Sequence, residues 1–165
     1  MSGDPQDLFE GRFQGPEQFA QLVRDALAAA AREGWRELLL SDPRFTDWPL
    51  GERAVAQSLT DWSSSGRKCI LLARRWDEAR FRHARFVTWR QTWSHIIDAR
   101  ACPSADEFEL PSAIWSPAWV LHRRDPVRST GFCGREPERR IELRQQIDEW
   151  LRRSAASFPA GIAGL

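Results

Sequence analysis

The 165-residue sequence predicts an α/β fold with a mostly parallel sheet and helices packed on both faces of that sheet. Segments whose apolar residues recur at helical spacing alternate along the chain with short runs of consecutive apolar residues. Such runs are typical of strands buried on both faces, as in parallel sheets. The alternation indicates βαβ units, whose right-handed crossovers place helices on the sheet faces. No repeat or long linker divides the chain, so we expect a single domain over residues 1–165, with loose termini at 1–7 and 155–165.

The first helix and the strands on either side of it have clear boundary signals. Residues 8–13 alternate weakly and predict a short edge strand. A helix is expected to begin at Pro16, since proline suits the first turn, and to end at Gly34, since glycine tolerates a left-handed cap. Residues 35–40, with three consecutive leucines, then predict a strand that is buried on both faces.

Two more helix and strand pairs follow. A second helix is predicted from an apolar stripe that ends at Trp62, and residues 69–73 predict a second buried strand. A third helix is expected over residues 78–95, with aromatic residues three and four apart. Residues 96–101 predict the third strand of the parallel set.

The pattern changes in the last third of the chain. Residues 103–111 predict an acidic loop, and residues 113–122 an extended aromatic segment interrupted by Pro117, which cannot donate a hydrogen bond to a sheet. Residues 123–134 are interpreted as a turn-rich connection. The closing helix is expected to begin near Pro137.

Composition narrows the classes of function. The net charge is +1, so no global field attracts nucleic acid or anionic lipid. The N-terminal residues lack the pattern of a signal peptide, and no apolar run approaches the roughly 20 residues of a membrane span. Cys69, Cys102 and Cys133 are far apart and odd in number, so neither a disulfide framework nor a zinc site is indicated. We therefore expect a cytoplasmic protein.

Familiar catalytic and cofactor motifs are missing. The sequence has no glycine-rich phosphate loop and no nucleophile elbow, so no cofactor is predicted. His83, His95 and His122 do not pair with another ligand at a metal-binding spacing, so no metal is predicted either.

The nine tryptophans suggest a contact surface or an aromatic core. Trp115 and Trp119 are four residues apart on an expected strand, which would place them on the same face. If that face is exposed, the two residues form an interface with a partner or a second copy; if a helix covers it, they are core. Core packing is the favoured interpretation.

The order of elements, with residues 35–42, 68–72 and the late strand, turn and helix, resembles one half of the phospholipase D superfamily. It is also similar to a group of uncharacterised bacterial proteins that carry such a half. That superfamily uses an H-x-K-x(4)-D motif, which this chain lacks. The nearest fragment begins at His122, has Arg124 at the position of the lysine, and has Ser129 at the position of the aspartate. The resemblance therefore implies a phospholipase D-like half-domain that is catalytically degenerate.

Two functional hypotheses follow from this resemblance. The first is a binding or interaction domain whose partner is a second copy of itself or another protein, without membrane contact. Nucleic acid is not expected as a partner, because the arginines of the last helix alternate with carboxylates and indicate a solvated face. The alternative is a phosphodiester hydrolase assembled in a homodimer, with His122 as nucleophile and Arg124 as phosphate ligand.

A ligand of an α/β sheet usually binds beyond the carboxyl ends of its strands. Asp42, Arg74, Arg75 and Arg100 follow or end the predicted strands. The three arginines could hold a phosphate or a carboxylate, although ordinary solvated loop charges are the simpler interpretation.

Overall fold

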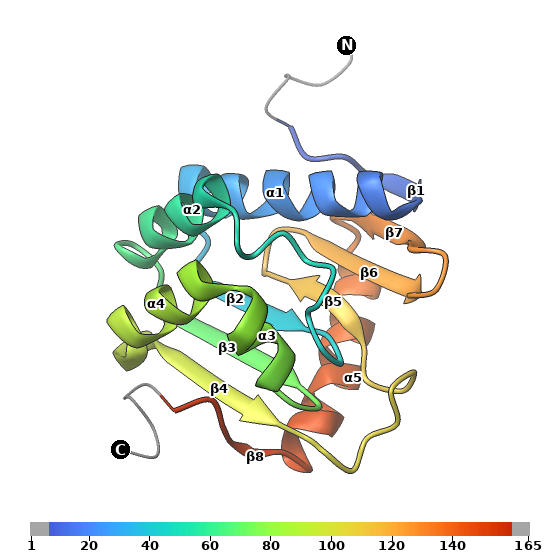
Figure 1. Ribbon diagram of the computed structural model, residues 1–165. Coiled ribbons are helices and arrows are strands. Elements are labelled where there is room, and N and C mark those ends of the chain that lie inside the picture. The colour runs from blue at the N-terminus through green and yellow to red at the C-terminus, as the bar shows by residue number, and fades with distance from the viewer. Residues whose placement is uncertain (1–6, 160–165) are drawn as a thin grey trace.

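The computed structural model describes residues 7–159 and contains one sheet of eight strands (Figure 1). The order of the strands in the sheet is β1-β7-β6-β5-β2-β3-β4-β8. The strands are β1 (Gly11–Gln14), β2 (Glu37–Ser41), β3 (Lys68–Ala73), β4 (Ile97–Ala101), β5 (Ser112–Trp115), β6 (Val120–Asp125), β7 (Thr130–Gly134) and β8 (Ala155–Ala156). The α-helices are α1 (Pro16–Glu33), α2 (Arg53–Ser63), α3 (Asp77–Arg82), α4 (Ala84–Thr92) and α5 (Pro137–Arg152).

The sheet is mostly antiparallel, so the prediction of a mostly parallel sheet is wrong. Only the pairs β2–β3 and β3–β4 are parallel. The other neighbours pair in opposite directions. The physical reason lies in the connections: β5, β6 and β7 are joined by short turns, and a parallel crossover needs a dozen or more residues.

Two segments of the predicted element map are corrected in the last part of the sheet. The segment expected to be one interrupted strand is a hairpin, and Pro117 lies in its turn. The Ser116 hydroxyl donates to the carbonyl of Trp119 at 2.7 Å and accepts from its amide at 2.9 Å, which closes that turn. The expected connection after residue 123 contains the end of β6 and all of β7.

The third predicted helix is broken. His83 has a non-helical backbone (φ −119°, ψ 71°) between α3 and α4. Its imidazole Nε2 lies 2.8 Å from the carbonyl oxygen of Phe45, so the break is tied to the loop after β2.

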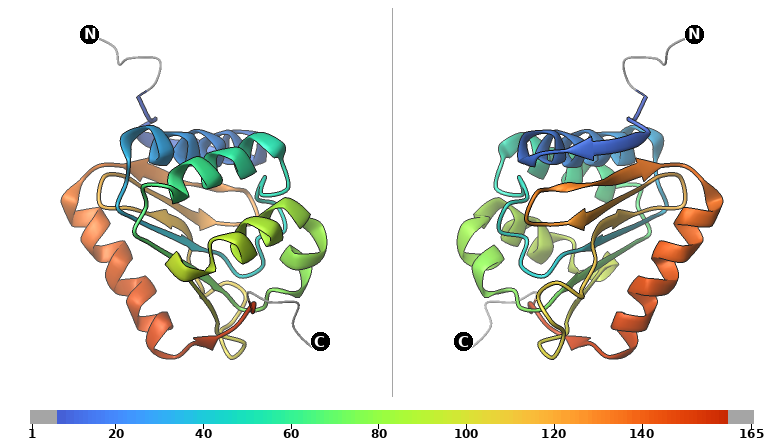
Figure 2. Two further views of the ribbon diagram at one scale, coloured as in Figure 1. Left: turned by 90° about the vertical axis from the view of Figure 1, so that its left-hand side faces the viewer. Right: turned by 90° about the vertical axis from the view of Figure 1, so that its right-hand side faces the viewer.

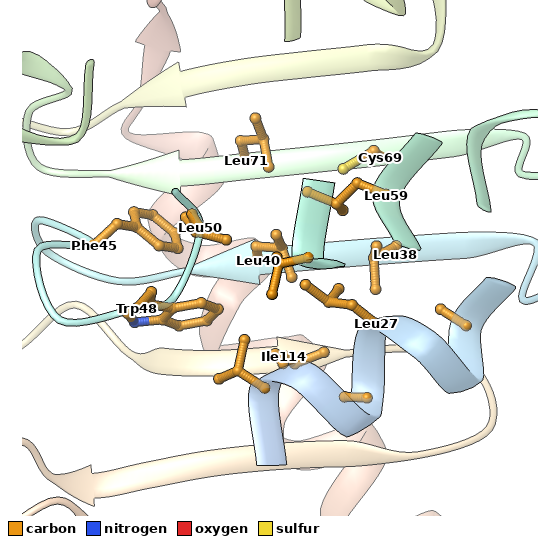
Figure 3. Packing of buried hydrophobic residues seen from close by; sticks show 14 of the residues in the cluster. Leu27, Leu38, Leu40, Phe45, Trp48, Leu50, Leu59, Cys69, Leu71 and Ile114 are labelled. Atoms are coloured by element: carbon orange, nitrogen blue, oxygen red, sulfur yellow. The ribbon is translucent and has the colours of Figure 1, made fainter. Parts of the chain in front are cut away.

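Helices α1, α2, α3 and α4 lie on one face of the sheet and α5 alone lies on the other (Figure 2). The alternation of side chains along β2 divides the core between these faces. Leu38 and Leu40 belong to the cluster formed with α1, α2 and α4, whereas Leu39 packs with Leu143 and Ile147 of α5. In Figure 3 the first cluster is seen between the strands and the helices, with side chains from β2, α1 and α2 pointing toward one another.

Helix α5 covers only part of its face. The apolar cluster beneath α5 draws on β2, β3, β5 and β6, and it contains no residue of β1 or β7. Within residues 7–159 the α5 side of this sheet edge is therefore free of a covering helix.

The C-terminal end of the described chain is held by β4. Ala155 and Ala156 pair with Ala101 and Arg100, and the Phe158 side chain is buried beside Trp76. The termini predicted to be loose are residues 1–7 and 155–165. Of these, residues 1–6 and 160–165 lie outside the described residues. None of the helices in the described part is long and apolar enough to cross a bilayer.

Gly131 permits β7 to lie close against β6. A Cβ atom at this position would lie 2.0 Å from the carbonyl oxygen of His122 and 2.8 Å from Cα of Arg123, so backbone would have to move. We expect Gly131→Ala to lower the free energy of unfolding by about 1–3 kcal/mol in urea titrations. Gly134→Ala on the same strand is the control, since its nearest atom would lie 3.9 Å away. Equal losses for the two variants would contradict the close-contact explanation.

Candidate functional site

The uncovered edge of the sheet carries a row of side chains on the α5 side. Arg12 of β1 and His122 of β6 are both register partners of Phe132, which lies between them on β7. Directly paired residues of antiparallel strands point to the same face. The three side chains therefore stand together on the α5 side of this edge, beside the first turn of α5.

Arginines surround the ring of Phe132. The guanidinium carbon of Arg139, from the first turn of α5, lies 4.0 Å from the ring centroid, and that of Arg124 lies 5.0 Å away. Arg12 is exposed beside them. Together these four residues line much of a surface hollow of about 550 Å³. We call Arg12, Arg124, Arg139 and Phe132 the arginine patch.

The arginine patch carries an excess of positive charge. No carboxylate lines the hollow. Among the described residues, Arg12 and Arg124 form none of the ion pairs, and Arg139 has only a peripheral contact of 3.7 Å with Glu136, whose side chain is 70% exposed. Exposed pairs of this kind contribute little energy. Guanidiniums that are not neutralised, next to a rigid aromatic ring, form a surface suited to phosphate or carboxylate groups.

His122 lies at the inner edge of the arginine patch and is neutral near pH 7. Burial, together with the nearby charge of Arg124, lowers the pKa of its imidazole to about 4. Its ring meets that of Phe132 edge to face, with 5.8 Å between centroids. His122 therefore supports the ring of Phe132 and adds no positive charge of its own at neutral pH.

Arg123 points to the opposite face of β6 and is almost wholly buried. Its guanidinium donates to both carboxylate oxygens of Asp47 (2.6 and 3.1 Å) and to Asp42 (3.1 Å). It also donates to the hydroxyls of Ser112 (3.0 Å) and Ser129 (3.2 Å). This buried cluster joins β6 to the loop after β2 and to the turn before β7, so it fixes the strand on which Arg124 is presented.

The structure does not gather the predicted strand-end residues into one site. The Asp42 carboxylate accepts hydrogen bonds from Arg123 and from the backbone amides of Arg44 and Phe45. Arg74 and Arg75 line a hollow of about 310 Å³ that also contains the carboxylates of Asp77 and Glu78.

Arg100 is directed elsewhere. Its side chain donates to the hydroxyl of Ser154 at 2.7 Å and to the carbonyl of the same residue at 2.9 Å. This contact anchors the segment after α5.

The two tryptophans considered as an interface make separate contacts within the chain. Trp119 is fully buried, donates to the carbonyl of Phe9 and stacks on Trp35 with 6.4 Å between centroids. Trp115 is half-buried under α5, where Arg144 lies 4.6 Å from its ring centroid. Trp119 thus belongs to the core on the α1 side of the sheet, whereas Trp115 packs on the α5 side. The expectation that the two share one face of one strand is wrong, because the chain turns between β5 and β6.

Sequence reasoning identified Arg124 but did not connect it with Arg12, Phe132 and Arg139. The sequence offered one usable signal. His122 and Arg124 are two residues apart on a strand, so their side chains share a face. Their partners lie on β7, β1 and the first turn of α5, and the pairing of β1 with β7 appears only in the tertiary structure. Within residues 7–159, no three histidine, cysteine, aspartate or glutamate side chains gather as a metal site.

No family model matches the chain. No curated protein matches it either. Among solved structures, the chain is similar to TrmBL2, which is described as an archaeal chromatin protein with a novel mode of DNA binding. The two share 13% sequence identity and superpose with a TM-score of 0.67 over 94% of this chain. The chain spans 56% of the TrmBL2 chain, and the likeness shows a shared fold.

These findings correct the assignment to a phospholipase D-like half-domain of a bacterial group. No family model supports that assignment, and the fold is shared with TrmBL2 over 94% of this chain. The resemblance depended on an order of elements along the chain. The same order is compatible with a sheet whose β5, β6 and β7 form an antiparallel meander, as observed.

Proposed function

We propose that this protein is a binding domain for DNA and that it contacts the phosphate backbone through the arginine patch. The observation that carries the proposal is the convergence of three guanidiniums from β1, β6 and α5 on one hollow that no carboxylate lines. Arginine presents a fork of donors that matches the oxygen pairs of a phosphate group.

This proposal replaces the expectation that nucleic acid is not a partner. That expectation treated the arginines of the last helix as a solvated face with alternating charges. In the structure, Arg139 turns toward β7 and joins Arg12 and Arg124. TrmBL2, which shares the fold, is described as binding DNA. That likeness suggests the class of ligand, and the arginine patch suggests where it would bind.

The expected binding is modest and strongly dependent on salt. The chain as a whole carries a net charge of only +1, so the attraction is local to the patch. Each neutralised phosphate contributes about −0.9 to the slope of log K against log salt concentration. Three arginine contacts would therefore give a slope of about −2.7.

Fluorescence anisotropy with a labelled DNA duplex of roughly two helical turns, titrated from low to physiological salt, tests this proposal. A triple variant should weaken binding by at least about tenfold and bring the salt slope close to zero. Its substitutions are Arg12→Gln, Arg124→Gln and Arg139→Gln. All three side chains are exposed, so the fold should be retained.

The matched control replaces three exposed arginines outside the patch, Arg36, Arg67 and Arg82, by glutamine. This variant has the same change in net charge and should bind within about threefold of the original protein. Equal weakening in the two triple variants would show that only net charge matters, and absence of binding at low salt would reject the proposed function.

A further inference from the structure

A second surface hollow lies between α2 and α4. These two helices cover the face of the sheet opposite to α5 (Figure 2). Its volume is about 460 Å³, which is within the range of small-molecule pockets. Trp89 and Trp93 of the α4 segment line it, and small residues such as Ala56 and Ala84 leave space between the helices. We call this hollow the α2–α4 groove.

The walls of the groove are apolar in practice. The hydroxyls of Thr88 and Thr92 donate to helix carbonyls one turn earlier, at 3.2 and 2.8 Å. The indole nitrogen of Trp89 donates to the Leu59 carbonyl and to Ser63, at 3.2 and 2.8 Å. The Gln57 amide donates to Asp61 at 2.8 Å. Apart from Thr60, Arg53 and Arg85, what the groove offers a ligand is therefore mainly hydrocarbon and aromatic surface.

One end of the groove is positively charged. Arg53 is the first residue of α2 and Arg85 the second of α4, and both helices run back between successive parallel strands. The two arginines are therefore at the same end, and no carboxylate lines the groove. Arg85 is held in place by its 2.7 Å hydrogen bond to the carbonyl of Gly51.

We propose that the α2–α4 groove binds a small amphiphilic carboxylate, with its acid group at Arg53 and Arg85 and its apolar body along Trp89 and Trp93. A cationic end and an apolar floor match a ligand with one anionic head and a hydrocarbon or aromatic body. Charge-assisted hydrogen bonds from guanidinium to carboxylate would set the orientation of the ligand. The site is separate from the arginine patch and does not depend on the proposed binding of DNA.

Decanoate is a suitable probe, with decanol and decyltrimethylammonium as neutral and cationic counterparts, all kept below the concentration at which they form micelles. Amide chemical shifts of the whole protein report where each compound binds. Decanoate should bind saturably below about 1 mM, with shifts concentrated at Ala56, Thr88 and Trp93. It should bind about three- to fivefold more tightly than decanol, because the arginines favour the carboxylate.

Two variants separate the head from the body of the ligand. Arg53→Gln with Arg85→Gln should abolish the preference for decanoate and leave the affinity for decanol unchanged. Thr88→Trp, which fills the groove from an exposed helical position, should abolish binding of both compounds. Arg36→Gln with Arg82→Gln is the control for net charge and should change neither affinity.

Three results would overturn the proposal. They are equal affinities for decanoate and decanol in the original protein, shifts scattered over the surface, and a preference for decanoate that survives Arg53→Gln with Arg85→Gln. The same groove variants should bind DNA with the affinity of the original protein. The proposal for the groove and the proposal for the arginine patch are therefore tested independently.

Discussion

Replacing Arg123 by methionine should lower the free energy of unfolding by about 3–5 kcal/mol, because the substitution leaves buried charge without a partner. Asp42 is 4% exposed and has Arg123 as its ion-pair partner at 3.1 Å. The guanidinium also lies 3.9 Å from the ring centroid of Phe19, so methionine can replace the packing on that ring but not the hydrogen bonds.

The loss should come mainly from Asp42 and less from Asp47. The carboxylate of Asp47 is half exposed, so water can solvate it once Arg123 is gone. Asp42 would keep only its bonds from the amides of Arg44 and Phe45. Asp42→Asn combined with Arg123→Met should therefore recover part of the lost stability, and a double-mutant cycle measures the coupling between the two residues.

Urea unfolding followed by tryptophan fluorescence measures these differences. Arg124→Met, the next residue on the strand, is the matched control and should change the free energy of unfolding by less than about 0.5 kcal/mol, because Arg124 is exposed. Arg123→Lys should show an intermediate loss, since one ammonium group cannot reproduce a bidentate bond. A loss below about 1 kcal/mol for Arg123→Met would contradict the assigned role.

Lowering the pH from neutral to 4 should remove about 3 kcal/mol of stability through His122 alone. Burial, then the charge of Arg124, lower the pKa of the folded imidazole from 6.5 to about 4. The unfolded chain therefore takes up a proton before the folded chain does as the pH falls. Stability from this residue is complete above pH 6.5 and is lost progressively down to about pH 4.

The comparison that isolates this effect is between the original protein and His122→Gln, which cannot titrate. Carboxylates and His83, whose pKa burial also lowers, titrate in both proteins and cancel in the difference. We expect the difference in free energy of unfolding between the two proteins to shift by about 3 kcal/mol between pH 7.5 and pH 4. A difference that does not depend on pH would show that His122 is hydrated in the folded state.

The candidate site illustrates what sequence patterns could and could not reveal. Arg124 stood out because it occupies one position of a fragmentary motif, and its place on a strand follows from alternation with His122. Arg12 and Arg139 are separated from it by long stretches of sequence. Arg12 comes near Arg124 only because β1 pairs with β7, a non-local choice that no local pattern contains. Arg139 comes near because α5 begins beside the hairpin of β6 and β7.

By itself the sequence determined the local elements with the strongest signals. The helix between Pro16 and Gly34, the buried strands β2 and β3, and the closing helix from Pro137 all form where apolar spacing and cap residues predict them. These features depend on contacts a few residues apart, which the chain specifies directly.

Only the tertiary structure decided the direction and order of the strands. The apolar run of β2 indicates burial on both faces but does not specify both of its neighbours, since β2 pairs in parallel with β3 and antiparallel with β5. The short turns after β5 and β6 required an antiparallel meander, and β5 pairs back onto β2. That pairing left one edge of the sheet beyond the reach of α5, so packing between distant segments, not local pattern, exposed the arginine patch.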